Sequence, residues 1–228
     1  MGSRLLMAAS FVDNGKTVCD VGCDHGKLSL YLIKEGKASH IIATDINDQP
    51  LQKAIDLFKN HNLSHTAEFL CTDGLQGIEN TDDITHVVIA GLGGRTMADV
   101  IESAEFVKRQ KTKLVLLPAQ NGHSIRKYLY ENGFSIEKEE NVYEKGKYYS
   151  CISAVYTGKV VEPDIFRNYI GECDKNTDSA ALGYMEMIAG QLKKKQKGIL
   201  IDTGIENVEF AKAISKIEQI VENIKSNQ

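Results

Sequence analysis

The sequence predicts an α/β protein with a parallel, doubly wound sheet that ends in an antiparallel hairpin and is followed by a helical hairpin. Three observations support this. Between residues 17 and 160, short runs rich in branched apolar residues alternate with longer segments of helical period. After Gly133, two strand-like runs flank a tight turn. Beyond Glu162 the strand signal fades and two helical segments remain.

Five short apolar runs are the expected parallel strands: residues 17–21, 40–45, 67–71, 87–90 and 114–117. Residues 26–36 and 50–61 are the expected helices between the first three strands, because their apolar residues recur along one helical face. Strands and helices that alternate in this way, joined by short turns marked by Gly, imply right-handed crossovers and a parallel sheet.

The last third of the chain changes character. Residues 134–141 and 148–156 are expected to pair as an antiparallel hairpin around the turn at 144–147. Residues 180–197 and 205–224 predict two helices that form an antiparallel hairpin or short coiled coil. We therefore expect a sheet domain of residues 1–161 and a helical arm of residues 162–228.

The charge composition limits the partners. The chain has 27 Lys and Arg against 31 Asp and Glu, a formal charge of −4. A protein that binds nucleic acid by charge alone would be strongly basic, so any nucleic acid must meet a local patch. The dense basic cluster Lys193, Lys194, Lys195 and Lys197 is either a solvated helix face or such a contact.

The apolar runs, the first residues and the cysteines limit the classes of protein to which the chain can belong. No apolar run approaches the length of a membrane-spanning helix, and the first residues lack the pattern of a leader, so we expect a cytoplasmic protein without membrane contact. The five cysteines are odd in number and form no C-x-x-C pair, so no metal is expected. Cys19 and Cys71 lie in apolar runs and are expected to act as small hydrophobes.

The loop after the first predicted strand is the strongest functional signal. It reads Asp-Val-Gly-Cys-Asp-His-Gly over residues 20–26, where a doubly wound fold places its nucleotide loop. Gly22 permits a tight turn and Gly26 lets the chain pack as the helix starts. Asp45, at the end of the second strand, has the position of an acid that binds ribose hydroxyls. The loop therefore predicts an adenosine-containing ligand.

Charge indicates which adenosine ligand. Asp20, Asp24 and Asp45 crowd the loop, and the G-x-G-x-x-G spacing is absent. A pyrophosphate needs backbone N–H groups with no acid beside them, whereas carboxylates suit the sulfonium cation of S-adenosylmethionine. The antiparallel hairpin at the end of the sheet favours the same ligand. The sequence thus favours a methyltransferase over a dinucleotide enzyme.

Loops after the later strands supply further candidates. Asp73 follows the third strand, in position to bind the adenine amino group. Residues 90–94, Ala-Gly-Leu-Gly-Gly, follow the fourth strand and allow close approach of cofactor and substrate. Gln120 and Asn121 follow the fifth, and Asn121 either donates its amide to a base or caps the helix from residue 122.

Several of these motifs resemble one family. Residues 19–26 (C-D-V-G-C-D-H-G), 3–5 (S-R-L), 8–11 (A-A-S-F) and 89–95 (I-A-G-L-G-G-R), with the C-terminal helical hairpin, resemble the bacterial tRNA adenine-22 N1-methyltransferases. The resemblance spans the whole chain. It implies a Rossmann-like class I domain, S-adenosylmethionine as cofactor, and methylation of adenine N1 in tRNA.

The chain departs from the family pattern at three places. Asp45 stands where the family usually has Glu, and Asp73 where it has Asn. Residues 117–119 are Leu-Pro-Ala where the family has Gln-Pro-Asn beside the acceptor, and Gln120 and Asn121 are candidates to compensate. These departures bear on the substrate more than on the cofactor.

The loops and the resemblance together give the candidate site. Expected cofactor residues are Asp20, Gly22, Cys23, Asp24, His25, Gly26, Asp45, Ile46, Asp73, Gly74, Ala90 and Gly91. Expected catalytic residues are Asp24, His25 and Asn121. Expected tRNA-binding residues are Gly93, Gly94, Arg95, Gln120, Lys193, Lys194, Lys195 and Lys197.

Two other functions remain open from the sequence. The net acidity and the missing Gln-Pro-Asn are compatible with a methyltransferase that acts on a small molecule. The same missing motif is compatible with a non-catalytic S-adenosylmethionine-binding RNA module. For the tRNA enzyme we expect a monomer.

Overall fold

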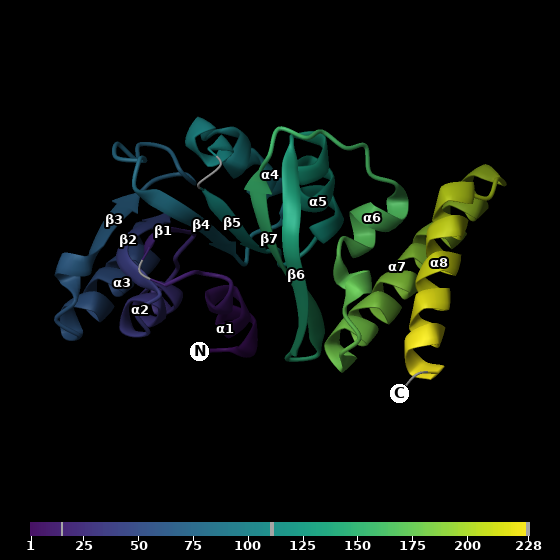
Figure 1. Cartoon of the computed structure of the whole chain (residues 1–228), viewed down its shortest axis with the longest axis horizontal. Coiled ribbons are helices and arrows are strands. Elements are labelled where there is room, and N and C mark those ends of the chain that lie inside the picture. The colour runs from purple at the N-terminus through teal and green to yellow at the C-terminus, as the bar shows by residue number, and fades with distance from the viewer. Residues whose placement is uncertain (15, 110–111, 227–228) are drawn as a thin grey trace.

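Short runs of branched apolar residues form the strands of one seven-stranded sheet (Figure 1). The computed structural model describes residues 1–14, 16–109 and 112–226. The strand order is β3-β2-β1-β4-β5-β7-β6. The strands are β1 (Lys16–Val21), β2 (Ala38–Asp45), β3 (Ala67–Cys71), β4 (Ile84–Ala90), β5 (Lys113–Leu117), β6 (Phe134–Glu144) and β7 (Lys147–Tyr156).

The pairing directions confirm the predicted fold class. Strands β1 to β5 pair in parallel, β7 pairs antiparallel with β5, and β6 pairs antiparallel with β7. The carboxyl ends of β1 to β5 therefore share one edge of the sheet. The chain leaves β1 for β2 on one side and reaches β4 on the other, which makes this edge the place where a doubly wound fold binds ligands.

Strand residues alternate between two hydrophobic cores, one on each face of the sheet. In β4, Val87 and Ile89 belong to one core and Val88 to the other. Helices α1 (Ser3–Ser10), α2 (Lys27–Lys34) and α3 (Asp48–Asn60) cover one face. Helices α4 (Gly94–Glu102) and α5 (Gly122–Glu131) cover the other. Short 3-10 turns lie at Ser64–Thr66, Glu105–Lys108 and Cys173–Lys175.

A third core lies beyond the β6 edge, in the C-terminal helices (Figure 1). These are α6 (Ile165–Ile170), α7 (Ser179–Thr203) and α8 (Val208–Ser226). Helices α7 and α8 pack side by side as the predicted hairpin. Helix α6 contacts α5, and α7 contacts both β6 and β7, so the arm is packed on the sheet domain.

The boundary predicted within this hairpin was wrong. The first helix was expected to end at residue 197, but α7 runs to Thr203, and Gly204 ends it with φ +70°. An interior Gly costs a helix only about 1 kcal/mol, so the exposed Gly198 does not end α7. Helix α8 begins at Val208, after Asn207 accepts a hydrogen bond from the Phe210 N–H at 3.1 Å.

A buried ion pair joins the arm to the sheet domain. Arg126 of α5 and Glu139 of β6 are both buried, and Arg126 Nη2 lies 2.5 Å from Glu139 Oε1. Arg126 also donates to the carbonyls of Asn168 and Tyr169 in α6 and to the Tyr184 hydroxyl in α7. Burial opposes the charge of Arg126, but Glu139 outweighs it and holds the pKa of Arg126 above its usual value.

Two further observations concern cysteines and membranes. All five cysteines are free, and Cys71 is exposed at the end of β3, so the expectation that it packs as a small hydrophobe was wrong. Its strand lies at the edge of the sheet, where one side is left open.

In the part of the chain that the structure describes, no helix has the length and apolar character needed to cross a membrane.

The buried pair predicts a large effect on stability. Arg126→Leu leaves the Glu139 carboxylate buried without its partner, so the free energy of unfolding should fall by about 3–5 kcal/mol. The neighbouring exposed Lys127→Ala should change it by less than about 0.5 kcal/mol. Urea unfolding of both full-length variants measures this, and equal effects would contradict the assignment.

Candidate functional site

The loop between β1 and α2 folds back over the end of β2. The backbone N–H groups of Gly22 and Cys23 both donate to the Thr44 carbonyl, at 2.8 and 2.9 Å. Gly22 has φ +68°, which agrees with the predicted tight turn. The loop is thereby fixed at the edge where the parallel strands end.

Asp45 holds the two neighbouring loops together. Its carboxylate accepts a hydrogen bond from the Asp24 N–H at 3.0 Å and another from the Asn47 N–H at 2.9 Å. Each carboxylate oxygen keeps a further acceptor position. Asp24 adopts φ +51°, a left-handed conformation that Asp tolerates, and its side chain is exposed at the site.

Two glycines permit close approach of backbone segments at this edge. Gly26 has φ +66°, and a Cβ there would lie 2.8 Å from Ala54 Cβ in α3. A Cβ on Gly94 would lie 2.2 Å from the carbonyl oxygen of Asn121. Gly26 therefore lets α2 pack on α3, and Gly94 lets α4 meet the loop after β5.

A cavity of about 110 Å³, which we call the β1 cavity, lies at this loop. Its predicted members are Asp20, Gly22, Cys23, Asp24, His25 and Ala90, and the other lining residues are Arg4, Leu5, Lys27 and Leu28. The remaining predicted cofactor residues, Gly26, Asp45, Ile46, Asp73, Gly74 and Gly91, lie at the neighbouring strand ends outside this lining.

The acids of the β1 cavity differ in environment. Asp20 is buried and accepts a hydrogen bond from the Ser29 hydroxyl at 2.5 Å. Burial raises the pKa of Asp20 to about 6 against the lowering effect of Ser29, and the charge of Asp45 adds to the rise. Burial followed by the charge of Asp20 also raises the pKa of Cys23, so this thiol stays protonated.

His25 leaves a polar atom without a hydrogen bond. Its Nδ1 lies 3.1 Å from Asp24 Oδ1, but the two groups lack the alignment of a hydrogen bond. A buried nitrogen in this state is available to a ligand that enters the β1 cavity.

A second cavity, of about 400 Å³, lies between the loop after β5 and helix α7. We call it the β5–α7 cavity, and it is lined by residues 118–122 and 147–150 with Tyr184, Met187, Ile188 and Gln191. Asn121, predicted as a catalytic or a capping residue, has φ +55° and its side chain makes no capping bond to α5. The capping interpretation is therefore wrong, and Asn121 is one of the residues that line this cavity.

The two cavities have a common wall. Arg4 of α1 lines the β1 cavity, and its guanidinium lies 5.3 Å from the ring centre of Tyr149, which lines the β5–α7 cavity. Glu144 fixes this arrangement, because its carboxylate accepts from the Ser3 hydroxyl at 2.9 Å and the Arg4 N–H at 3.1 Å. The contact between Arg4 and Tyr149 therefore joins the linings of the two cavities.

Comparison with known proteins identifies the family. A family model described as a methyltransferase domain matches residues 1–152. The chain belongs to this methyltransferase family.

Full-length relatives extend the comparison. The tRNA (adenine(22)-N(1))-methyltransferase of Bacillus subtilis is 24% identical over 229 residues, which cover 100% of this chain and 90% of the relative. A Streptococcus pneumoniae protein, solved in complex with S-adenosyl-L-methionine, has 25% identity and a TM-score of 0.81 over 97% of this chain and 100% of that chain. Mycoplasma capricolum TrmK, solved with S-adenosylhomocysteine, has the same fold, with 23% identity and a TM-score of 0.76 over 99% and 98%.

Sequence reasoning missed several residues of this methyltransferase site. Arg4 lies in one of the motifs that resemble the family, but no role is predicted for it from the sequence. Tyr148 and Tyr149 were taken only as strand residues of β7, although they line the β5–α7 cavity. Both are half-buried aromatic residues near the start of a strand whose next five residues are buried, which is ordinary for β7, so no sequence signal distinguishes them.

The predicted basic cluster is divided between two faces of α7. Lys193 pairs with Glu218 of α8, whereas Lys195 Nζ donates a hydrogen bond to the Tyr169 hydroxyl at 2.6 Å. Lys194 and Lys197 are exposed. Because successive helical residues turn by 100°, three consecutive lysines do not share one face.

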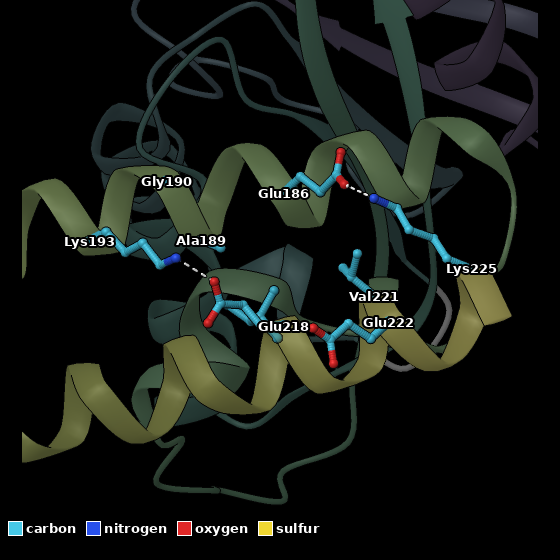
Figure 2. A pocket seen from close by; sticks show the side chains of 9 residues that line it. Glu186, Ala189, Gly190, Lys193, Glu218, Val221, Glu222 and Lys225 are labelled. Atoms are coloured by element: carbon cyan, nitrogen blue, oxygen red, sulfur yellow. Dashed lines mark hydrogen bonds and ion pairs between the residues drawn. The ribbon is translucent and has the colours of Figure 1, made fainter.

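Lys193 belongs to a groove between α7 and α8 of about 480 Å³ (Figure 2). Ion pairs Lys193–Glu218 and Lys225–Glu186 cross it, and Glu222 adds a third carboxylate. Three glutamates against two paired lysines make this groove a poor phosphate site.

The raised pKa of Asp20 predicts a pH-dependent stability. Between pH 4 and 6 the folded methyltransferase holds a proton on Asp20 that the unfolded chain has released, so its stability falls as pH rises. Asp20→Asn removes this loss. The unfolding free energy of the variant relative to wild type should rise by up to about 3 kcal/mol between pH 4 and 7.

Urea titrations of both proteins without cofactor, at several pH values, measure this difference. Parallel curves for wild type and Asp20→Asn across the range would show that Asp20 does not titrate in this way.

Proposed function

We propose that this chain transfers a methyl group from S-adenosylmethionine to N1 of adenine 22 in tRNA. One observation carries the proposal: an acid-lined cavity at the β1 loop shares the Arg4–Tyr149 wall with a larger cavity suited to a base. The Bacillus subtilis tRNA (adenine(22)-N(1))-methyltransferase, which aligns with the whole chain, supports the same substrate.

The residues of the β1 cavity fit S-adenosylmethionine. Asp20 and Asp24 supply negative charge for its sulfonium and amino groups, and Arg4 supplies positive charge for its carboxylate. The unpartnered His25 Nδ1 is a further buried polar atom in the lining. Asp45 with Ile46 and Asp73 with Gly74 extend the site along the strand ends, where we place the ribose and adenine. When bound, the cofactor supplies an electrophilic methyl group.

The chain needs little acid–base chemistry for this reaction. Adenine N1 has a free lone pair, so the protein's task is to orient the base and to stabilise the positive charge that develops on it. Asp24 is exposed at the site and is the carboxylate we assign to that charge, with His25 beside it. The Asn121 amide and the Tyr149 ring orient the base in the β5–α7 cavity.

The proposed substrate also explains the arm. N1 lies on the Watson–Crick edge, so a paired adenine must leave its helix before it reaches the site. Residues 162–228 form the arm that we propose to hold the tRNA, together with Gly93, Gly94, Arg95 and Gln120. Gln120 lines the β5–α7 cavity, and Gly93 forms a β-bridge with it. We propose that the chain works as a monomer in the cytoplasm, without a metal.

Methylation of tRNA tests the function directly. Full-length protein, radiolabelled S-adenosylmethionine and unmodified bacterial tRNA should give a primer-extension stop at adenine 22. A control tRNA with adenine 22 replaced by guanine should show no stop. Binding of tRNA without methylation would indicate a non-catalytic RNA module, and label on small metabolites with untouched tRNA would indicate a small-molecule enzyme.

Asp24→Asn should lower kcat by about 100-fold, because the amide keeps the left-handed backbone but removes the charge that stabilises the methylated base. The Kd of S-adenosylmethionine, measured by calorimetry, should rise far less than kcat falls, because Asp20 also supplies negative charge to the cofactor. Asp48→Asn, in the exposed first turn of α3, is the control and should retain kcat. A loss in Kd as large as that in kcat would make Asp24 only a cofactor ligand.

Tyr149→Ala should raise the KM for tRNA about tenfold, since the stacking of one base on an aromatic ring contributes about 1–3 kcal/mol. Tyr149→Phe keeps the ring and should stay close to wild type. Steady-state kinetics with both variants, together with cofactor binding, measure this. An equal loss in Tyr149→Phe would argue against stacking.

A further inference from the structure

A third cavity lies where the arm meets the sheet domain. It has a volume of about 140 Å³ and we call it the seam cavity; it is lined by Asn121, Gly122, His123, Tyr169, Tyr184, Ile188, Gln191 and Lys195. Five of these residues also line the β5–α7 cavity: Asn121, Gly122, Tyr184, Ile188 and Gln191. The seam cavity is therefore an extension of the cavity in which we place the acceptor base.

Lys195, the cation of the seam cavity, is held in place by Tyr169. The rings of His123 and Tyr169 stack with their centres 4.5 Å apart and their planes within 2°. Lys195 Nζ lies 2.6 Å from the Tyr169 hydroxyl and 5.0 Å from the centre of its ring. No carboxylate pairs with Lys195 among the described residues.

Helical spacing separates this lysine from the rest of the basic cluster. Tyr184, Ile188, Gln191 and Lys195 follow one another by three or four residues and form one stripe of α7, which faces the sheet domain. Glu186, Ala189, Gly190 and Lys193 form a second stripe, which faces α8 (Figure 2). Only the first stripe reaches the proposed acceptor cavity.

The charge around the seam differs from that of the chain as a whole. Among the described residues that line the seam and β5–α7 cavities there is no carboxylate, although the chain carries a net charge of −4. Burial lowers the pKa of His123 to about 4, and the charges of Lys195, Arg126 and Arg95 add to that effect. The described lining thus carries the cations Lys147 and Lys195 and no carboxylate, which favours an anionic ligand.

We infer that the seam cavity is a phosphate subsite, in which Lys195 and Gln191 bind an RNA backbone phosphate next to the acceptor adenosine. The inference rests on the proposed tRNA substrate. It names the contact that positions one phosphate of that tRNA. A volume of 140 Å³ holds a few waters, at about 30 Å³ each, which the phosphate oxygens replace. Because the seam cavity and the β5–α7 cavity share five lining residues, a phosphate in the first can belong to the nucleotide whose base lies in the second.

The test measures tRNA binding against salt concentration for the full chain with S-adenosylhomocysteine present. Lys195→Gln should weaken tRNA binding about fivefold at 0.15 M salt and lower the slope of log K against log salt by about 1, as expected for one lost phosphate contact. Lys195→Arg should restore the slope. Lys59→Gln, at an exposed position in the last turn of α3, removes the same charge outside the arm and should leave the slope unchanged.

The outcomes separate the subsite from the function. An unchanged slope in Lys195→Gln, or an equal change in Lys59→Gln, overturns the subsite while wild type still methylates tRNA. A wild type that neither binds nor methylates tRNA overturns the proposed function and the subsite with it. Tyr169→Phe is the second variant, because it removes the hydroxyl that Lys195 contacts and keeps the lysine charge. A purely structural Lys195–Tyr169 contact would alter the melting temperature and not the salt slope. Tyr169→Phe should therefore keep the slope near that of wild type.

Discussion

The buried ion pair between Arg126 and Glu139 is the interaction on which the arrangement of the site depends. Glu139 accepts hydrogen bonds from Arg126, from the Ser150 hydroxyl and from the Glu172 N–H, so its charge is satisfied from three elements. Arg126 in turn binds the last carbonyls of α6 and the Tyr184 hydroxyl of α7. A buried pair contributes little stability by itself, but its satisfied partners specify one orientation of the arm.

That orientation creates the cavities. Tyr184 lies in both the β5–α7 cavity and the seam cavity, and it is held by the same guanidinium that pairs with Glu139. Arg126 belongs to α5, whose first residues form the opposite wall. The pair therefore fixes the distance between the arm and the loop after β5. A change in the pair acts on substrate binding through this distance, without touching the substrate.

The fold and the position of the site could be predicted from the sequence because local patterns determine both. The alternation of strands and helices gave the parallel sheet, and the acidic loop after β1 gave the edge that carries the β1 cavity. The methyltransferase family suggested by the motifs is confirmed by the family model over residues 1–152. The assignment of individual residues to cofactor or substrate remains a prediction.

What the sequence could not give arises from tertiary contacts. Arg126 and Glu139 are 13 residues apart in a helix and a strand, and each alone resembles an ordinary surface charge. Helix α6 has six residues, too few for a periodic signal. Helix α7 is covered on two sides, by α8 and by the sheet domain, so its pattern does not reveal which lysine faces the site. Asn121 resembled a cap because its left-handed backbone cannot be seen in the sequence.

We propose that the RNA enters between α7 and the loop after β5. Hydroxyl-radical footprinting of the full chain, with and without tRNA and in the presence of S-adenosylhomocysteine, tests it at single side chains. We expect protection of Tyr149 and Met187, which line the β5–α7 cavity, and none of Tyr156, which lies at the opposite end of β7 from Tyr149. Unchanged reactivity of Tyr149 and Met187, with protection confined to the α7–α8 groove, would contradict it.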